Sequence, residues 1–247
     1  MAIDVTIFEY KTNKVNRDYR IVHLSDYHSN NKIDVAEAVV NLNPDLIVFT
    51  GDLIDRRRYD IDSAMLLIDE LKHICSIYYI SGNHEAWSGH YDEVKEELIK
   101  RNVFVLEDNS YTYDDLNIVG LKDFGFGLKD GTNTEITDIK SRVMKNNVVK
   151  NHLNILLVHR PELLKEYSKY DYNIIFSGHA HGGQFRFFNR GLYSPNQGIL
   201  PKYTSGRHEM NGSTLFISRG LGNSRFPIRI FNNFEIIVVD VKEDVKC

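Results

Sequence analysis

The chain contains 247 residues, with 30 lysines and arginines against 34 aspartates and glutamates, which gives a formal net charge of −4. Hydrophobic residues make up 42% and charged residues 26% of the sequence, and the mean hydropathy is −0.34. This balance excludes collagen-like, coiled-coil and disordered chains, and it predicts a single globular domain over residues 1–247. The acidic balance offers no general attraction for nucleic acid, so a nucleic-acid partner is not expected.

The apolar runs and the N-terminus predict where the protein is located. No stretch approaches the roughly 20 apolar residues of a membrane span. The first ten residues, MAIDVTIFEY, lack the basic and apolar regions of a signal peptide. Two cysteines, Cys75 and Cys247, are too few for a disulfide framework. We expect a cytoplasmic protein as the sequence stands, and a membrane-anchored or extracytoplasmic one if an N-terminal segment is missing.

The first half of the chain alternates short apolar runs with helical spacings. Ile61, Ala64, Met65, Ile68 and Leu71 share one face, which predicts an amphipathic helix over 60–71 that packs on the core. Weaker helical patterns cover residues 33–42, 91–100, 135–145 and 161–167.

The second half has a different character. From Gly182 onward, connections rich in glycine, asparagine, proline and serine separate strand-like runs at 184–188, 215–218, 228–231 and 235–241. The segment 189–213 is too long for a simple turn, and we expect it to be a loop at the substrate site. The sequence therefore predicts strand–helix alternation followed by a sheet with long loops.

Five separate apolar runs end in side chains that bind metals. The runs are RIVHLSDYH, DLIVFTGD, SIYYISGNH, NILLVH and YNIIFSGHAH. In an open α/β sheet the carboxyl ends of the strands form one rim, where ligands collect. We therefore expect one shared site that contains Asp26, His28, Asp52, Asn83, His159, His179 and His181.

The residue types at this site predict a two-metal centre. Asp26 and His28 are separated by one residue, as are His179 and His181, so an extended chain would place each pair on one side. Seven nitrogen and oxygen ligands without a thiolate do not fit a structural zinc site. Two divalent cations, with Mn expected first and Fe, Zn, Co or Ni as alternatives, would retain a net positive charge for a phosphoryl group.

The same motifs resemble those of the calcineurin-like metallophosphoesterases. The resemblance rests on D-x-H at 26–28, GDLID at 51–55, GNHE at 82–85, the lone His159 and GHAH at 178–181, in this order. The runs HAHGGQFR, SPNQGILPKY and SRGLGNS resemble a bacterial branch that includes membrane-associated phosphoesterases and some UDP-2,3-diacylglucosamine diphosphatases. The resemblance implies an α/β fold, a four-layer α-β-β-α sandwich.

The resemblance also implies a role for each site residue. One metal would be held by Asp26, His28 and His181, the other by Asn83, His159 and His179, and Asp52 would bridge the two. A metal-bound hydroxide would attack phosphorus while His84 stabilises the transition state or protonates the leaving oxygen. Asp55 is expected to orient His84 through a hydrogen bond. Arg56, in the basic turn 56–58, and Arg229 are candidates to bind the substrate phosphate.

The expected activity is metal-dependent hydrolysis of a phosphate ester, first of all a phosphodiester.

One alternative is a diphosphatase that acts on a lipid-linked nucleotide sugar. A lipid substrate requires an apolar patch near the site, and residues that would otherwise pack a sheet are its candidates: Phe185, Phe187, Phe188, Leu192, Tyr193, Ile199, Leu200 and Tyr203. The non-enzyme alternative is a protein-binding scaffold, although scaffolds typically lose ligands that this chain retains. The expected partner is thus a phosphorylated small molecule or a lipid-linked substrate, with peripheral membrane association left open.

Overall fold

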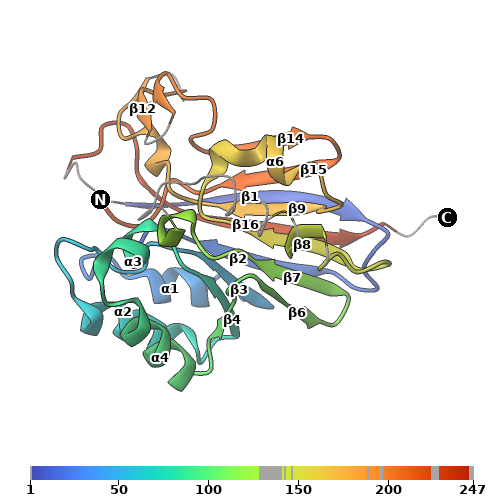
Figure 1. Cartoon of the computed structure of the whole chain (residues 1–247), viewed down its shortest axis with the longest axis horizontal. Coiled ribbons are helices and arrows are strands. Elements are labelled where there is room, and N and C mark those ends of the chain that lie inside the picture. Colours follow the sequence, from blue (N-terminus) through green and yellow to red (C-terminus); the bar gives the residue numbers. More distant parts are fainter. Residues whose placement is uncertain are drawn as a thin grey trace.

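Two six-stranded sheets form the centre of the molecule (Figure 1). The computed structural model describes residues 2–127, 141, 143–145, 147–187, 190–194, 197–223 and 228–244. The first sheet has the strand order β1-β16-β2-β3-β4-β5, and the second has the order β14-β15-β9-β8-β7-β6. Each sheet therefore joins segments that are far apart in the sequence.

The first sheet carries a parallel centre and an edge made by the two ends of the chain. Its strands are β1 (Ile3–Thr12), β16 (Phe234–Glu243), β2 (Tyr19–Leu24), β3 (Leu46–Thr50), β4 (Ser76–Ile80) and β5 (Phe104–Val105). β2, β3, β4 and β5 run parallel, β16 runs antiparallel to β2, and β1 runs parallel to β16. The parallel strands are apolar on both faces, as expected for strands that are covered from both sides.

The second sheet has a similar parallel centre. It consists of β6 (Asn109–Tyr113), β7 (Leu116–Gly120), β8 (Leu153–Leu157), β9 (Ile174–Ser177), β14 (Gly206–Met210) and β15 (Ser213–Ile217). β7, β8, β9 and β15 are parallel, while β6 and β14 close the edges as antiparallel partners. The carboxyl ends of β8 and β9 are therefore on the same edge of this sheet.

Helices cover the outer faces of both sheets. α1 (Val35–Val40), α2 (Ile61–Leu71) and α4 (Tyr91–Lys100) lie on the first sheet, and α3 (Asn83–Ser88) follows β4 (Figure 1). On the second sheet are η2 (Pro161–Leu163) and α6 (Leu164–Tyr167), while η1 (Phe124–Gly127) packs beside α3. After β9 come η3 (His181–Gly183) and four two-residue strands, β10 (Arg186–Phe187), β11 (Arg190–Gly191), β12 (Tyr193–Ser194) and β13 (Gly198–Ile199).

Alternating side chains divide the interior into three apolar cores. Val48 and Ile155 point between the sheets, where they join Phe176. Phe49, the next residue on β3, packs against the helices of the first sheet, and Leu156 packs against the outer layer of the second. Three cores separate four layers, which makes the molecule an α/β sandwich of the predicted kind.

The helix predictions agree with the structure where periodicity and capping coincide. α2 begins after Asp60, whose carboxylate accepts the Ser63 N–H at 2.9 Å. α4 covers the predicted range 91–100, η2 and α6 together cover 161–167, and α1 is shorter than the predicted 33–42. The predicted helix over 135–145 falls largely outside the described residues.

Two strand predictions in the second half were wrong in extent. Of the described residues 184–187 in the predicted run 184–188, Arg186–Phe187 is a strand, and 228–231 contains a single bridge, Phe185 to Ile230. β14 lies inside the segment 189–213, which had been predicted to be a loop, because its residues pair with β15 across a tight turn. These differences arise from partner strands, which local apolar patterns do not reveal.

The core between the sheets allows a stability prediction. The ring of Phe216 lies 5.1 Å from that of Phe8 and 5.7 Å from that of Phe176, and it is fully buried. Replacement Phe216→Ala should lower the free energy of unfolding by about 3–5 kcal/mol, because it leaves a cavity. Urea denaturation would measure the loss. Ile99→Ala, at an exposed site, is the control and should change stability by less than about 0.5 kcal/mol; a similar loss in both variants would contradict the assigned core.

Candidate metal centre

The structure brings all seven predicted ligands together at one end of the sandwich. Asp26 and His28 follow β2, Asp52 follows β3, and Asn83 begins the helix after β4. His159 follows β8, and His179 and His181 follow β9, in the other sheet. The expectation of a single sheet rim is therefore corrected, since the carboxyl ends of strands from two stacked sheets line one site.

The buried donor atoms form three groups: two of them share Asp52, and the third contains His28, Asp55 and His84. The first contains Asp26, His28, Asp52 and His181, and the second contains Asp52, His159 and His179. In the first group, His181 Nε2 lies 3.3 Å from His28 Nε2 and 3.4 Å from Asp26 Oδ1. In the second group, Asp52 Oδ2 lies 3.3 Å from His159 Nε2.

The tautomer of His159 is determined by the main chain. Its Nδ1 lies 2.7 Å from the carbonyl oxygen of Thr50, and a carbonyl can only accept, so Nδ1 carries a proton. In the neutral ring, Nε2 therefore presents a lone pair, and it faces Asn83 Oδ1 at 3.1 Å, His179 Nδ1 at 3.2 Å and Asp52 Oδ2 at 3.3 Å. Several electron-pair donors thus point at one another in a buried space, an arrangement that a cation stabilises.

The pKa values of His159 and Asp52 also show that the site favours positive charge. Burial lowers the pKa of His159, but the nearby Asp52 outweighs burial and raises the pKa to about 10. Burial also raises the pKa of Asp52, yet His159 and His84 hold it well below its usual range. Burial lowers the pKa of His179 and of His181 well below the usual range, so these two rings are neutral.

Five of the seven side chains project from a left-handed backbone. The φ angles are 52° at Asp26, 50° at His28, 54° at Asp52, 67° at His179 and 46° at His181. The chain is thus not extended across either i, i+2 pair, which corrects the geometry expected from their spacing. Each such residue costs roughly 1–2 kcal/mol relative to an ordinary backbone conformation, and such conformations gather at functional sites that the surrounding structure holds in place.

Close backbone contacts hold these turns together. The N–H of Asp26 donates to Gly51 O at 2.9 Å, and that of His28 donates to Asp52 O at 3.0 Å. A Cβ atom on Gly178 would overlap the Asp26 carboxylate, so only glycine fits there. The N–H of His179 donates to both Asp26 carboxylate oxygens, at 3.0 and 3.1 Å, and this contact ties the two sheets together beneath the site.

Glu85 joins the turns after β3 and β4 from below. Its fully buried carboxylate accepts N–H groups from Asp52 at 2.8 Å, Ile54 at 3.1 Å and Gly82 at 2.7 Å. Burial raises the pKa of Glu85 to about 7. This side chain therefore sets the positions of Asp52 and of the turn that carries Asn83.

His84 is held by the main chain instead of by Asp55. The Arg56 N–H donates to His84 Nδ1 at 3.2 Å, whereas Asp55 Oδ1 is 3.8 Å from that nitrogen and accepts the Arg57 N–H at 2.8 Å. The predicted hydrogen bond from Asp55 is therefore absent, because the turn after Asp55 directs the carboxylate to its own backbone. Burial lowers the pKa of His84, and the proton of the neutral ring is on Nε2.

The two candidate arginines have different surroundings. The exposed Arg56 guanidinium lies over the ring of Trp87, with Cζ 4.8 Å from the ring centroid. Arg229 is buried beside the site, where its N–H groups reach Arg219 O at 2.7 Å, Asn223 Oδ1 at 3.2 Å and His181 Nδ1 at 3.2 Å. Arg229 therefore contacts the site through His181, while Arg56 lies at its rim.

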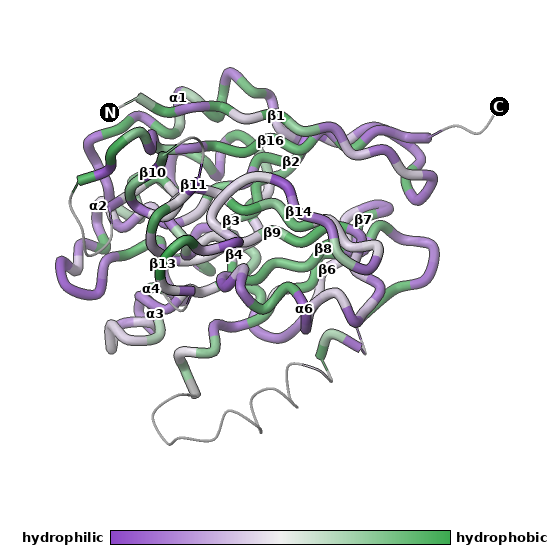
Figure 2. Tube along the Cα trace, turned by 90° about the horizontal axis from the view of Figure 1, so that it is seen from above, coloured by the Kyte–Doolittle hydropathy of each residue, from purple (hydrophilic) through white to green (hydrophobic). Residues whose placement is uncertain are grey.

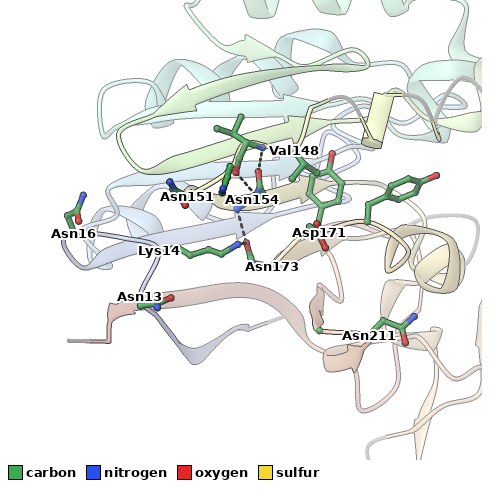
Figure 3. Close-up of a pocket in the computed structure, with 14 residues that line it drawn as sticks. Asn13, Lys14, Asn16, Val148, Asn151, Asn154, Asp171, Asn173 and Asn211 are labelled. Carbon is green, nitrogen blue, oxygen red and sulfur yellow. Dashed lines mark hydrogen bonds between the residues drawn. The ribbon is translucent and has the colours of Figure 1, made fainter. Parts of the chain in front are cut away.

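Two pockets differ in their relation to the site. A polar pocket of about 320 Å³ opens beside His28 and is also lined by Lys32, Arg58, Asp60 and Asn223. A wider pocket, of about 860 Å³, lies at the opposite ends of β8 and β9 and is lined by asparagines (Figure 3). Several of those amides are engaged with protein atoms; for example, Lys14 Nζ donates to Asn173 Oδ1 at 3.0 Å. None of the residues that line this second pocket is one of the seven predicted ligands.

Sequence reasoning missed the groups that position the ligands. Thr50 orients His159 through its carbonyl oxygen, and its hydroxyl lies 2.8 Å from the buried His23 Nε2. Glu85 was visible as the last letter of GNHE, but nothing local indicated its three backbone partners. Arg56 contributes its N–H group, which no side-chain pattern can reveal.

Comparison with known proteins agrees with this geometry. The family model described as calcineurin-like phosphoesterase matches residues 19–183. The chain belongs to the calcineurin-like phosphoesterase family. Members of this family use divalent metals and act on phosphoesters, and the buried groups of histidines and aspartates in this chain could hold such ions.

Individual relatives extend the comparison over most of the chain. An uncharacterized metallophosphoesterase of Bacillus subtilis, YkuE, is 30% identical over 89% of this chain and 76% of its own length. A bovine transmembrane protein with a metallophosphoesterase domain is 26% identical over 88% of this chain and 51% of its own length. The structure of a dimetal phosphatase from Danio rerio matches with a TM-score of 0.51 and 12% identity, covering 83% of this chain and 88% of that one, which shows a shared fold. Within the described part of this chain, no helix is long and apolar enough to cross a membrane.

The Glu85 contacts predict a combined loss of stability and metal. Glu85→Gln would turn an N–H group toward backbone donors, so the free energy of unfolding should fall by about 2 kcal/mol or more. The variant should also bind metal at least about tenfold more weakly, because Asp52 loses its support. Denaturation and metal titration would measure both. Glu96→Gln, on the exposed surface of α4, is the control. If Glu85→Gln has the same stability and metal affinity as this control, Glu85 does not position Asp52.

Proposed function

We propose that this member of the family hydrolyses phosphodiesters with two divalent metal ions, Mn being the first candidate. The observation that carries the proposal is the buried convergence of Asn83 Oδ1, His179 Nδ1 and Asp52 Oδ2 on His159 Nε2. The nitrogen and oxygen donors, without sulfur, suit Mn, Fe, Co, Ni or Zn.

The two buried groups support the ligand assignment. Asp26, His28 and His181 would hold one ion, and Asn83, His159 and His179 the other. Asp52 would bridge them, because it is the residue common to both groups. Two such ions supply Lewis-acid stabilisation of a phosphoryl group and activate water as a nucleophile.

The role proposed for His84 is proton donation to the leaving oxygen. Its Nδ1 accepts the Arg56 N–H, so the remaining proton is on Nε2. Its ring centroid is 4.4 Å from that of His28, which places it next to the first metal group. The Asp55 carboxylate, 3.8 Å from Nδ1, favours a positive charge on this ring without sharing its proton.

The substrate would approach through the pocket beside His28. Lys32 and Arg58 give that pocket positive charge, which suits a phosphate or another anionic group of the substrate. Arg56 is the second candidate for a phosphate contact, because its exposed guanidinium lies at the rim over Trp87. Arg229, whose donors are engaged with protein atoms, would act by orienting His181.

A second candidate function is hydrolysis of a diphosphate in a lipid-linked nucleotide sugar. It is favoured by the exposed apolar side chains that follow η3, among them Phe187 and Leu192. A protein-binding scaffold is the remaining alternative, and it predicts no turnover by the metal-loaded protein. Activity on a soluble diester separates the scaffold from both enzymatic functions.

The bridging assignment predicts the effect of a single substitution. Protein stripped of metal by a chelator should not hydrolyse bis(p-nitrophenyl) phosphate, and Mn²⁺ should restore turnover. In Asp52→Asn, turnover should fall more than about 100-fold, because both ions lose a charged ligand. Bound metal would be counted by elemental analysis. Asp92→Asn, exposed on α4, is the control; an Asp52 variant that holds two ions and keeps the parental rate would refute the assignment.

The proton-donor role predicts a dependence on the leaving group. A general acid contributes about 10²–10⁴-fold to the rate, and a poor leaving group needs it more than a good one. His84→Gln should therefore reduce hydrolysis of a phenyl diester more than that of the p-nitrophenyl diester. Parallel kinetics with metal-loaded protein would measure the two losses, and His73→Gln, at an exposed site, is the control. Equal losses with both leaving groups would exclude proton donation by His84.

A further inference from the structure

Four short segments next to η3 form a thin β-layer that we call the apolar lobe: residues 185–187, 190–194, 198–200 and 228–231. Backbone hydrogen bonds join them side by side, from Arg186 N to Ile230 O at 3.0 Å, Leu192 N to Phe185 O at 2.8 Å and Leu200 N to Leu192 O at 3.0 Å. In Figure 1 the part around β12 projects beyond the two large sheets, and in Figure 2 the trace at β13 has the colour of hydrophobic residues. The lobe is therefore one continuous surface feature.

The lobe exposes large apolar side chains in a concentration that a soluble surface rarely shows. Its exposed residues, with their exposed fractions, are Phe231 (85%), Ile199 (82%), Leu200 (68%), Phe187 (63%), Ile228 (61%), Ile230 (46%), Tyr193 (45%) and Leu192 (40%). Single exposed apolar residues are ordinary, whereas a contiguous group marks a surface that contacts another apolar phase. Of the residues named as candidates for an apolar patch, Phe187, Leu192, Tyr193, Ile199 and Leu200 are thus exposed instead of packed in a sheet.

Two of the most exposed residues also have an unfavourable backbone. Leu200 has φ of 54° and Phe231 has φ of 52°. This region is rare for bulky side chains and costs roughly 1–2 kcal/mol per residue. Backbone strain and apolar exposure therefore both raise the free energy of this conformation of the lobe in water. Strained residues gather at functional sites, so we interpret this surface as a binding site.

The charge of this region identifies its partner. Between Gly182 and Phe234 the sequence has one acidic residue, Glu209, and seven basic residues, in a chain whose net charge is −4. Part of this charge is neutralised, because Arg207 pairs with Glu209 at 2.7 Å and Arg219 pairs with Asp4 at 2.9 Å and with Glu235 at 3.1 Å. Arg190, in the lobe, and Lys202, two residues after its third segment, are exposed in the structure. A second copy of the chain, docked through the same surface, would place these positive charges against each other. An anionic lipid surface satisfies both the charges and the apolar side chains.

We propose that the apolar lobe docks on an anionic phospholipid bilayer. Phe187, Ile199, Leu200 and Phe231 would enter the headgroup region, with Arg190 and Lys202 on lipid phosphates. The Leu192 N–H donates to Gly183 O at 3.2 Å, so the lobe is attached directly to η3, which begins with His181. Docking would therefore hold the metal centre next to the membrane surface, and it does not depend on the proposed phosphodiesterase activity.

Vesicle sedimentation with the full chain would test the proposal. Vesicles of phosphatidylglycerol mixed with phosphatidylcholine should bind the protein at least about tenfold more tightly than vesicles of phosphatidylcholine alone, and added salt should weaken that binding. The double variant Ile199→Asp with Leu200→Asp should bind at least about tenfold more weakly. The matched control, Leu66→Asp with Ile99→Asp, removes two exposed apolar residues (63% and 53% exposed) from α2 and α4 and should bind like the parent.

The outcomes separate this proposal from the proposed function. Absence of vesicle binding, equal binding to neutral and anionic vesicles, or equal losses in the lobe and control variants would overturn membrane docking. Self-association that the lobe variant abolishes, without vesicle binding, would assign the lobe to a second copy and also overturn it. Hydrolysis of the soluble bis(p-nitrophenyl) phosphate by the lobe variant would show that this variant is folded. If the metal-loaded parent protein does not hydrolyse this diester, that result counts against the proposed function and not against membrane docking.

Discussion

The structure depends on one electrostatic constraint, the confinement of several electron-pair donors in a buried space at the carboxyl ends of the two sheets. His159 is the clearest case, because its Nδ1 donates to the Thr50 carbonyl and its Nε2 faces other acceptors. Such an arrangement is unfavourable in a bare protein and becomes favourable when cations occupy it. The raised pKa of His159 expresses the same demand for positive charge.

The fold brings the donors together because two sheets are stacked, and the carboxyl ends of their central parallel strands lie at the same end of the sandwich. Neither sheet alone supplies both donor groups, since Asp26 and Asp52 come from one and His159 and His179 from the other. The left-handed turns that present these residues are held by contacts that cross between sheets, such as His179 N–H to the Asp26 carboxylate. Rigidity beneath the site therefore comes from tertiary contacts, and the strained backbone persists because several partners hold each turn.

The segments above the site have the opposite character. The β-layer after η3 consists of two-residue strands and exposes apolar side chains, while the floor of the site is buried and polar. Arg229, in the lobe segment 228–231, connects the two regions, with its guanidinium over the Phe234 ring and one N–H at His181. A change in the position of the lobe would therefore reach His181 through a short chain of direct contacts, which connects the surface proposed to meet a membrane with the proposed first metal site.

The amino-acid sequence by itself determined which residues surround the site, because each follows an apolar run. It also determined α2 through periodicity and the Asp60 cap, and α4 through periodicity. Tertiary structure decided the rest. β1 pairs with β16 from the other end of the chain, β14 forms because β15 is beside it, and His84 bonds to the Arg56 N–H instead of to Asp55. Strand partners, backbone donors and exposure depend on segments distant in the sequence, so local patterns of residue type carry no record of them.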